Sequence, residues 1–173
     1  MTVFVKRPRK SSALLVNFRA MKIIVYSDEH RVATITFIED ILEHEFHATG
    51  IDRPDLRTIS RTYQCEAGQF WLALDDKGIA GTVALKDHGE GRGYLQRMYV
   101  RPDLRGKGLA QQLLDTLLRH ARDHQYHILY LATIPAMVAA NKFYQKSGFT
   151  QIGHLPPDMP AREDSVFYKR ELG

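Results

Sequence analysis

The residues whose types and spacing point most directly to chemistry stand at positions 105–108, an Arg-Gly-Lys-Gly sequence. Residues 94–100 before them are rich in β-forming side chains, and after them apolar residues recur at helical spacing: Leu109, Leu113, Leu114, Leu117, Leu118 and Ala121. This order predicts a strand, a basic loop with two glycines, and a helix. Amides at a helix N-terminus bind anions and glycines let a ligand approach the backbone, so we expect phosphate or pyrophosphate there.

Two other phosphate-binding motifs do not match this loop. No Ser or Thr follows Lys107, as a P-loop requires, and no third glycine stands at the spacing of the dinucleotide-binding fingerprint. An ordinary turn with solvated charges is the alternative, but the strand–loop–helix order favours the anion site.

The strand before the loop has the pattern of an interior strand. Its two alternating sets of side chains are both mixed in polarity, which favours an interior position, with a bulge, over a half-exposed edge. Pro102 then ends the pairing because proline has no N–H to donate.

Tyr144 is the second candidate for chemistry, within the sequence Lys-Phe-Tyr-Gln-Lys-Ser-Gly-Phe at 142–149. Its spacing alone is more typical of a core aromatic residue. A tyrosine O–H can nevertheless act as a general acid.

These segments together resemble the GNAT superfamily of acyl-coenzyme A N-acyltransferases. Residues 105–110 are similar to its Arg/Gln-x-x-Gly-x-Gly/Ala segment, residues 100–102 stand where it usually has Val-x-Pro, and residues 144–149 are similar to its Tyr-x-x-x-Gly-Phe segment. The likeness continues to Gly148 and, more loosely, back to Ile23, so it covers most of the chain.

The resemblance implies transfer of an acetyl group from acetyl-CoA, as co-substrate, to a primary amine by direct attack in a ternary complex. It implies that pantetheine lies along the strand on backbone groups of Met98 and Val100, and that Tyr144 protonates the departing thiolate. The pyrophosphate would bind at the loop and helix start, with residues Arg105, Gly106, Lys107, Gly108, Leu109 and Ala110. Arg101 is a further candidate for this contact.

The sequence departs from the superfamily before the tyrosine. Many relatives carry Asn seven residues before it, where this chain has Met137. Asn141 is three residues before Tyr144, on a different helix face, so the role of that asparagine is not transferred to it.

The general base is not identified by the sequence. Relatives often place a glutamate on the strand that enters the loop, but residues 94–100 contain no carboxylate. Gln96 could order a water molecule, and the flanking loops offer Glu66, His88 and Asp164. Nothing in the sequence favours one of them.

The 173 residues suit one domain with a sizeable core, and we expect it at 21–173. The pattern predicts an α/β (α+β) fold with a mixed, mostly antiparallel sheet of about seven strands, and one central βαβ crossover beside a splayed middle strand. Besides the segments above, we expect a helix from Ser27 or Asp28 to Gly50, a helix from Pro54, a helix from Pro135 to Lys146, and strands at 23–26, 69–74, 79–86, 128–133, 149–154 and 165–170. The loop 155–162 is long enough to cover a site.

Residues 1–20 differ from the rest of the chain. They carry five of the 24 basic residues and no acid, which leaves 19 basic against 20 acidic residues beyond them. We interpret them as a disordered or dispensable basic extension, with the native start at Met21 as one explanation. A tail for nucleic acid or a membrane surface is the alternative.

Composition limits the remaining classes. No apolar run is long enough to span a membrane, and one cysteine excludes an internal disulfide framework, which fits a cytoplasmic protein. The histidines do not have metal-site spacing, so no metal is expected. The acceptor can be a small-molecule amine or a protein amine. Nucleic acid is disfavoured as a partner, and a homodimer is left open. A non-catalytic acetyl-CoA sensor is the alternative from another class.

Overall fold

The computed structural model describes residues 21–47, 50, 52–161 and 164–173. The predicted extension 1–20 lies outside the described residues. Within them the chain forms a seven-stranded sheet in the order β1-β2-β3-β4-β5-β7-β6. The strands are β1 (Lys22–Val25), β2 (Gln69–Asp75), β3 (Gly78–Asp87), β4 (Arg92–Val100), β5 (Ile128–Thr133), β6 (Thr150–Ile152) and β7 (Val166–Glu171).

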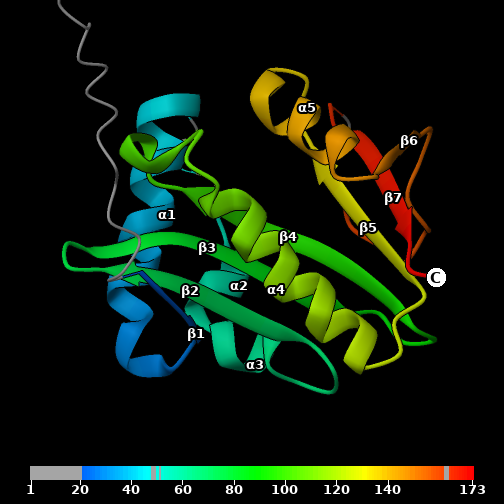
Figure 1. The fold of residues 1–173 in the computed structure, drawn as a ribbon, viewed down its shortest axis with the longest axis horizontal. Helices are drawn as coiled ribbons and strands as arrows, with labels where there is room; N and C mark the ends of the chain where they lie inside the picture. The colour runs from blue at the N-terminus through cyan, green and yellow to red at the C-terminus, as the bar shows by residue number, and fades with distance from the viewer. Residues whose placement is uncertain (1–20, 48–49, 51, 162–163) are drawn as a thin grey trace, which may run out of the picture.

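All neighbouring strands pair antiparallel except β4 and β5, which pair parallel. The helix α4 (Leu109–Asp123) connects these two strands, and this is the predicted βαβ crossover. The expected fold class, with its mostly antiparallel sheet and central crossover, is confirmed (Figure 1).

Helices cover both faces of the sheet. On one face lie α1 (Arg31–Phe46), α2 (Pro54–Arg57) and α3 (Ile59–Tyr63), which pack on β2 and β3 through a cluster that includes Ile38, Leu56, Phe70 and Leu72. On the other face, α4 and α5 (Val138–Lys146) share a larger cluster with β3, β4 and β5. Figure 1 shows α4 in front of the sheet and α1 behind it.

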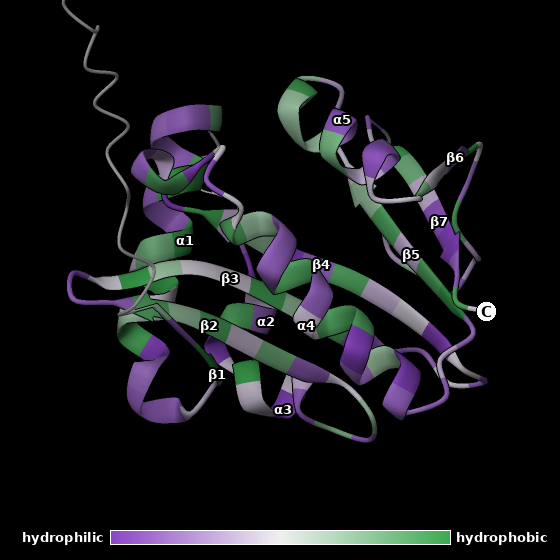
Figure 2. Ribbon diagram, viewed as in Figure 1, coloured by the Kyte–Doolittle hydropathy of each residue, from purple (hydrophilic) through white to green (hydrophobic). Residues whose placement is uncertain are grey.

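The apolar stripe of α4 fixes its position. Its six predicted inward residues are all buried: Leu109, Leu113, Leu114, Leu117, Leu118 and Ala121. Polar and apolar bands alternate along this helix in Figure 2. Burying the apolar stripe against the sheet orients the helix so that its N-terminus follows directly on the loop after β4.

Three expected helices differ from the structure. The first begins with a 3₁₀ turn (Asp28–His30), and its last helical residue is Phe46. His47 follows with φ 49° and donates its amide to Glu43 O, so His47 rather than Gly50 stops this helix. The helix predicted from Pro54 is two short helices, because Thr58 has φ −134° and ψ 51° and interrupts the helical backbone. The helix predicted from Pro135 begins at Val138.

Candidate active site

The site lies where β4 and β5 diverge. The two strands pair over only four residues each, from Arg92 with Ile128 to Leu95 with Leu131. Beyond this point they separate and leave a cavity of about 480 Å³, here called the β4–β5 cleft. It is lined by Tyr94, Leu95, Gln96, Arg97, Met98, Tyr99, Ala132, Thr133, Ile134, Met137, Ala140, Tyr144, Pro160, Ala161 and Ser165.

A bulge in β4 lies at the cleft. On β3, Thr82 pairs with Tyr99 and Ala84 with Gln96, so two residues of β4, Arg97 and Met98, stand opposite one residue of β3. Arg97 has φ 51°, and its carbonyl accepts a 2.7 Å hydrogen bond from Thr82 Oγ1. Bulges bend the strand that carries them, so this one contributes to the divergence of β4 from β5.

The edge of β4 beyond the bulge faces the cleft. Arg101 N donates to Ala80 O at 2.9 Å, and Val100 is the neighbouring residue paired with Gly81. Because hydrogen-bonded and non-hydrogen-bonded pairs alternate in an antiparallel ladder, the N–H and C=O of Val100 point to the side where β5 has separated. This edge offers backbone groups to an extended ligand.

The predicted anion site directly follows this edge. Gly106 and Gly108 have φ 69° and 90°, a conformation that glycine adopts readily, and no heavy atom lies within 4 Å of a Cβ built on either residue. The first backward bond of α4 runs from Gln112 N to Gly108 O at 3.1 Å. The preceding amides of the helix therefore have no partner inside it and lie next to open space.

The arginines around this loop are already paired. Arg105 donates to both carboxylate oxygens of Glu45 at 2.7 Å and to Val100 O at 3.0 Å. Arg101 is held by Asp75 and Asp103. Lys107 is exposed. The loop amides and Lys107 therefore face solvent, whereas the two guanidinium groups contact carboxylates.

Tyr144 lies in the wall of the cleft. Its ring packs among Phe143, Phe149 and Tyr168, with centroid distances of 5.6, 5.7 and 6.3 Å. Within the described part of the chain its hydroxyl group forms no hydrogen bond, although the residue lines the cavity. Burial, with a smaller effect of Tyr99, raises the pKa of Tyr144 far above its usual value of 10.0, so the hydroxyl stays protonated near neutral pH.

Asn141 does not line the cleft. Its amide nitrogen donates to Ile134 O and Met137 O at 3.0 and 2.9 Å, and its oxygen accepts from Tyr168 Oη at 2.8 Å. These bonds fix the turn that precedes α5, so Asn141 supports the helix that carries Tyr144.

Only one of the four candidate bases lines the cleft, and it is Gln96. His88 instead lies at the end of the β3–β4 hairpin, where Nδ1 is 3.3 Å from Asp158 Oδ2. Glu66 is exposed in the turn before β2, and Asp164 precedes the lining residue Ser165.

The loop after β6 covers one end of the cleft, as its length predicted. Tyr94 Oη donates to Pro160 O at 2.9 Å, and Arg92 pairs with Asp158 at 3.0 Å. Pro160 and Ala161 thereby become part of the cleft wall.

The sequence reasoning missed a polar group beneath the cleft. Arg97, which lines the cavity, is paired with Asp55 of α2, and Tyr63 of α3 donates to the same carboxylate at 2.6 Å. Burial alone would raise the pKa of Asp55, but the hydrogen bonds and charge of Arg97 outweigh it and hold the pKa below its usual 3.8. In the sequence, the only sign of this ion pair was the basic residue Arg97 among the otherwise uncharged residues 94–100.

Comparison with known proteins agrees with this geometry. Residues 35–149 match the Acetyltransferase (GNAT) family, and the chain belongs to that family. N-acetylaspartate synthetase of Rattus norvegicus is 37% identical over 101 residues, which cover 57% of this chain and 34% of that protein. The chain thus spans about a third of that relative's length.

Solved structures share the fold over nearly the whole chain. An acetyltransferase of the GNAT family from Staphylococcus aureus Mu50 superposes with a TM-score of 0.84 at 32% identity, covering 89% of this chain and all of that one. An acetyltransferase from Salmonella typhimurium, whose structure contains its cofactor acetyl-CoA, has a TM-score of 0.69 at 21% identity and covers 89% of this chain and 95% of its own. The second likeness concerns the fold alone.

In the described ranges no three His, Cys, Asp or Glu side chains come together as a metal site. The same residues include no helix that is long and apolar enough to cross a membrane.

Proposed function

We propose that this chain transfers an acetyl group from acetyl-CoA to a primary amine by direct attack in a ternary complex. The observation that carries the proposal is the position of Tyr144, a buried residue in the wall of the β4–β5 cleft whose hydroxyl group is protonated and has no partner among the described residues. A thiolate leaving group needs such a donor.

The cleft and the loop fit the coenzyme. Pantetheine would extend along β4 as an added strand on the backbone of Met98 and Val100, at the edge that β5 leaves open. The pyrophosphate would lie on amides of residues 106–110, where the open space beside Gly106 and Gly108 admits it. Lys107 is available for a phosphate contact, and Arg105 would reach one by exchanging Glu45.

In the reaction the amine nitrogen attacks the thioester carbonyl carbon, a C–N bond forms and the C–S bond breaks. The Tyr144 proton passes to the departing sulfur, and the amine proton passes to a water molecule held at Gln96. The tyrosinate regains its proton from solvent, so no covalent enzyme intermediate is needed.

A small primary amine is the acceptor that we propose first. The relative named above is a synthetase of an N-acetylated amino acid, and Pro160 and Ala161 contribute to the wall of the cleft. A protein lysine or N-terminus is the alternative within the same chemistry.

The test is thiol release from acetyl-CoA measured with a panel of amino acids, polyamines and lysine-containing peptides. We expect release that depends on one class of amine and yields the N-acetyl product by mass spectrometry. Coenzyme binding by calorimetry without amine-dependent thiol release on any of them would instead indicate the sensor module.

A further inference from the structure

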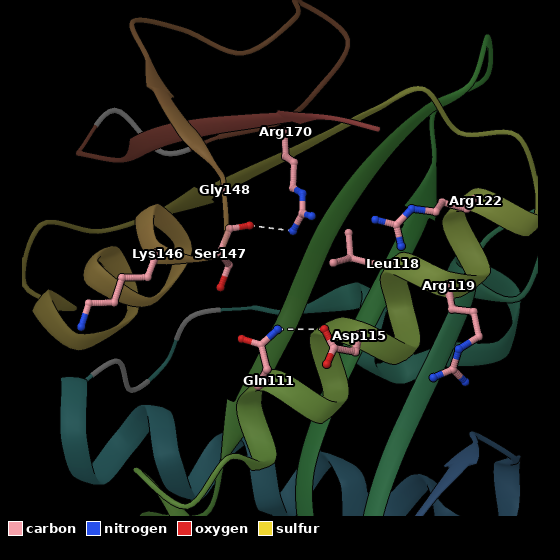
Figure 3. Close-up of a pocket in the computed structure, with 9 residues that line it drawn as sticks. All are labelled: Gln111, Asp115, Leu118, Arg119, Arg122, Lys146, Ser147, Gly148 and Arg170. Atoms are coloured by element: carbon pink, nitrogen blue, oxygen red, sulfur yellow. Dashed lines mark hydrogen bonds between the residues drawn. The ribbon is translucent and has the colours of Figure 1, made fainter. Parts of the chain in front are cut away.

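A second hollow lies on the α4 side of the sheet, between α4, the turn from α5 into β6, and β7 (Figure 3). Its volume is about 620 Å³, within the usual range for small-molecule sites. Four basic side chains line it, namely Arg119, Arg122, Lys146 and Arg170, against one carboxylate, Asp115. We call it the basic hollow.

Two of these side chains face each other. In Figure 3 the guanidinium groups of Arg122 and Arg170 point toward one another above Leu118, whereas Arg119 and Lys146 point away. Arg170 is fixed in this position because its Nη1 donates to Ser147 O at 2.6 Å and its guanidinium carbon lies 5.9 Å from the ring centre of Phe149. The site is therefore partly formed before any ligand binds.

Charge pairing in the basic hollow differs from that of four other arginines in the described part of the chain. Elsewhere arginines that line loops and strands pair with carboxylates, as in Arg92–Asp158, Arg97–Asp55, Arg101–Asp75 and Arg105–Glu45. Within the ranges that the structure describes, neither Arg122 nor Arg170 forms an ion pair. Asp115 accepts its 2.8 Å hydrogen bond from Gln111 instead.

The electrostatic effect on Arg170 agrees with this arrangement. Burial and then the charge of Arg122 lower the pKa of Arg170, and Asp115 opposes them only as the smallest of the three effects. Two facing cations that form no ion pair attract a divalent oxyanion, and the planar guanidinium group matches the geometry of phosphate.

The hollow begins at Gln111, close to the loop assigned to the coenzyme pyrophosphate, but its arginines on α4 lie further along the helix. Arg119 and Arg122 follow Leu109 by ten and thirteen residues on α4. At the rise of an α-helix these positions lie roughly 15 to 20 Å along the axis from its N-terminus. One pyrophosphate group cannot contact both places.

We propose that Arg122 and Arg170 bind the phosphate group of a small-molecule ligand other than the coenzyme. The negative charge of Asp115 limits the affinity of this site for phosphate. Ser147 and Gly148 also line the hollow. The proposal does not depend on the acetyl-transfer reaction, because it is tested by ligand binding at the hollow and not by enzyme activity.

The test uses inorganic pyrophosphate as the probe, titrated into the full chain saturated with coenzyme A and followed by the amide NMR signals of Ser147 and Gly148. We expect these signals to shift, and Arg122→Gln to weaken the binding about tenfold or more, the effect of losing one charged hydrogen-bonding partner. Asp115→Asn should act in the opposite direction and tighten binding about threefold, since it removes a nearby negative charge.

Arg61→Gln is the matched control, because it removes the same charge from an exposed residue of α3 on the opposite face of the sheet. Equal weakening by Arg61→Gln, or unshifted Ser147 and Gly148 signals, would overturn the proposal. The proposal would also be overturned if coenzyme A blocked the binding of pyrophosphate and dephospho-coenzyme A did not. The hollow would then hold the 3′-phosphate of the coenzyme. If coenzyme does not bind the chain at all, the shifts at Ser147 and Gly148 still decide the question, while the proposed function fails separately.

Discussion

The guanidinium group of Arg97 donates two hydrogen bonds to the carboxylate of Asp55, from Nε to Oδ2 at 2.8 Å and from Nη2 to Oδ1 at 2.6 Å. Only 18% of the Arg97 side chain and 20% of the Asp55 side chain are exposed. This pair joins α2 to the bulge of β4 and therefore supports the strand that forms one wall of the cleft.

We expect Asp55→Asn to lower the free energy of unfolding by about 3 kcal/mol at pH 7, because the charge of Arg97 then remains buried without its partner. The pKa of Asp55 is lowered in the folded state, so its contribution is present above the ordinary pKa of 3.8 and is lost as the pH falls through the folded value. The stabilities of the parent and the variant should therefore begin to converge as the pH falls below about 4, and become equal only below the folded pKa of Asp55. Urea unfolding at pH 7 and at acid pH measures both effects.

Asp52→Asn is the control for this prediction. Asp52 pairs with Arg57 in the same segment, but 65% and 69% of the two side chains are exposed, so the change should cost less than about 1 kcal/mol. Equal stabilities for the Asp55 and Asp52 variants would contradict a buried, stabilising pair.

Gly108→Val should weaken the binding of acetyl-CoA at least about 100-fold, because the valine side chain would fill the space where phosphate meets the backbone amides. Valine also strains a backbone with φ 90°, so the loss of stability needs its own control. Gly78→Val provides it, since Gly78 has φ 109° and equally open surroundings at the start of β3. Calorimetry that finds both variants binding acetyl-CoA alike would remove the loop from the site.

Glu45→Gln should tighten acetyl-CoA binding by up to about fivefold if Arg105 contacts a phosphate, because the variant releases Arg105 from a partly exposed ion pair. Arg105→Gln should weaken binding in the same assay. If Glu45→Gln leaves the dissociation constant unchanged while Arg105→Gln only lowers stability, Arg105 is a structural partner of Glu45 and not a coenzyme ligand.

The features that the sequence predicted are local in the chain. The loop at 105–108 and the inward stripe of α4 follow from spacing within one segment, and both lie where expected. The divergence of β4 from β5 was also expected, because the family that residues 94–110 resemble has a fold with a splayed sheet.

The features that the sequence did not predict join distant segments. Asp55 and Arg97 are separated by 42 residues, and Glu45 and Arg105 by 60. No pattern of spacing distinguishes these charges from solvated ones, since only the folded chain decides which carboxylate reaches which guanidinium group. The interruption of the helix at Thr58 is of the same kind. Tyr63, which follows Thr58, donates to Asp55, which precedes it, and Asp55 also pairs with Arg97 of a distant strand.

Tyr144→Phe should lower kcat by on the order of 100-fold and leave the affinity for acetyl-CoA nearly unchanged. Phenylalanine keeps the ring and its packing against Phe143, Phe149 and Tyr168, and removes only the hydroxyl group, which has no partner among the described residues. A donor that acts mainly when the thiolate departs contributes to the transition state and not to ground-state binding, so the effect belongs in kcat.

Tyr168→Phe is the matched control for this last prediction. It removes a hydroxyl group from a neighbouring ring, but that hydroxyl donates to Asn141 Oδ1 at 2.8 Å, and Tyr168 is not among the described residues that line the cleft. We expect it to cost about 1 kcal/mol of stability, the usual value for one lost hydrogen bond, with kcat within about twofold of the parent. Steady-state kinetics and thermal unfolding of both variants separate the roles. Full turnover with reduced stability in Tyr144→Phe would make that residue a core aromatic, and the proton for the sulfur would then come from water or from the protonated amine.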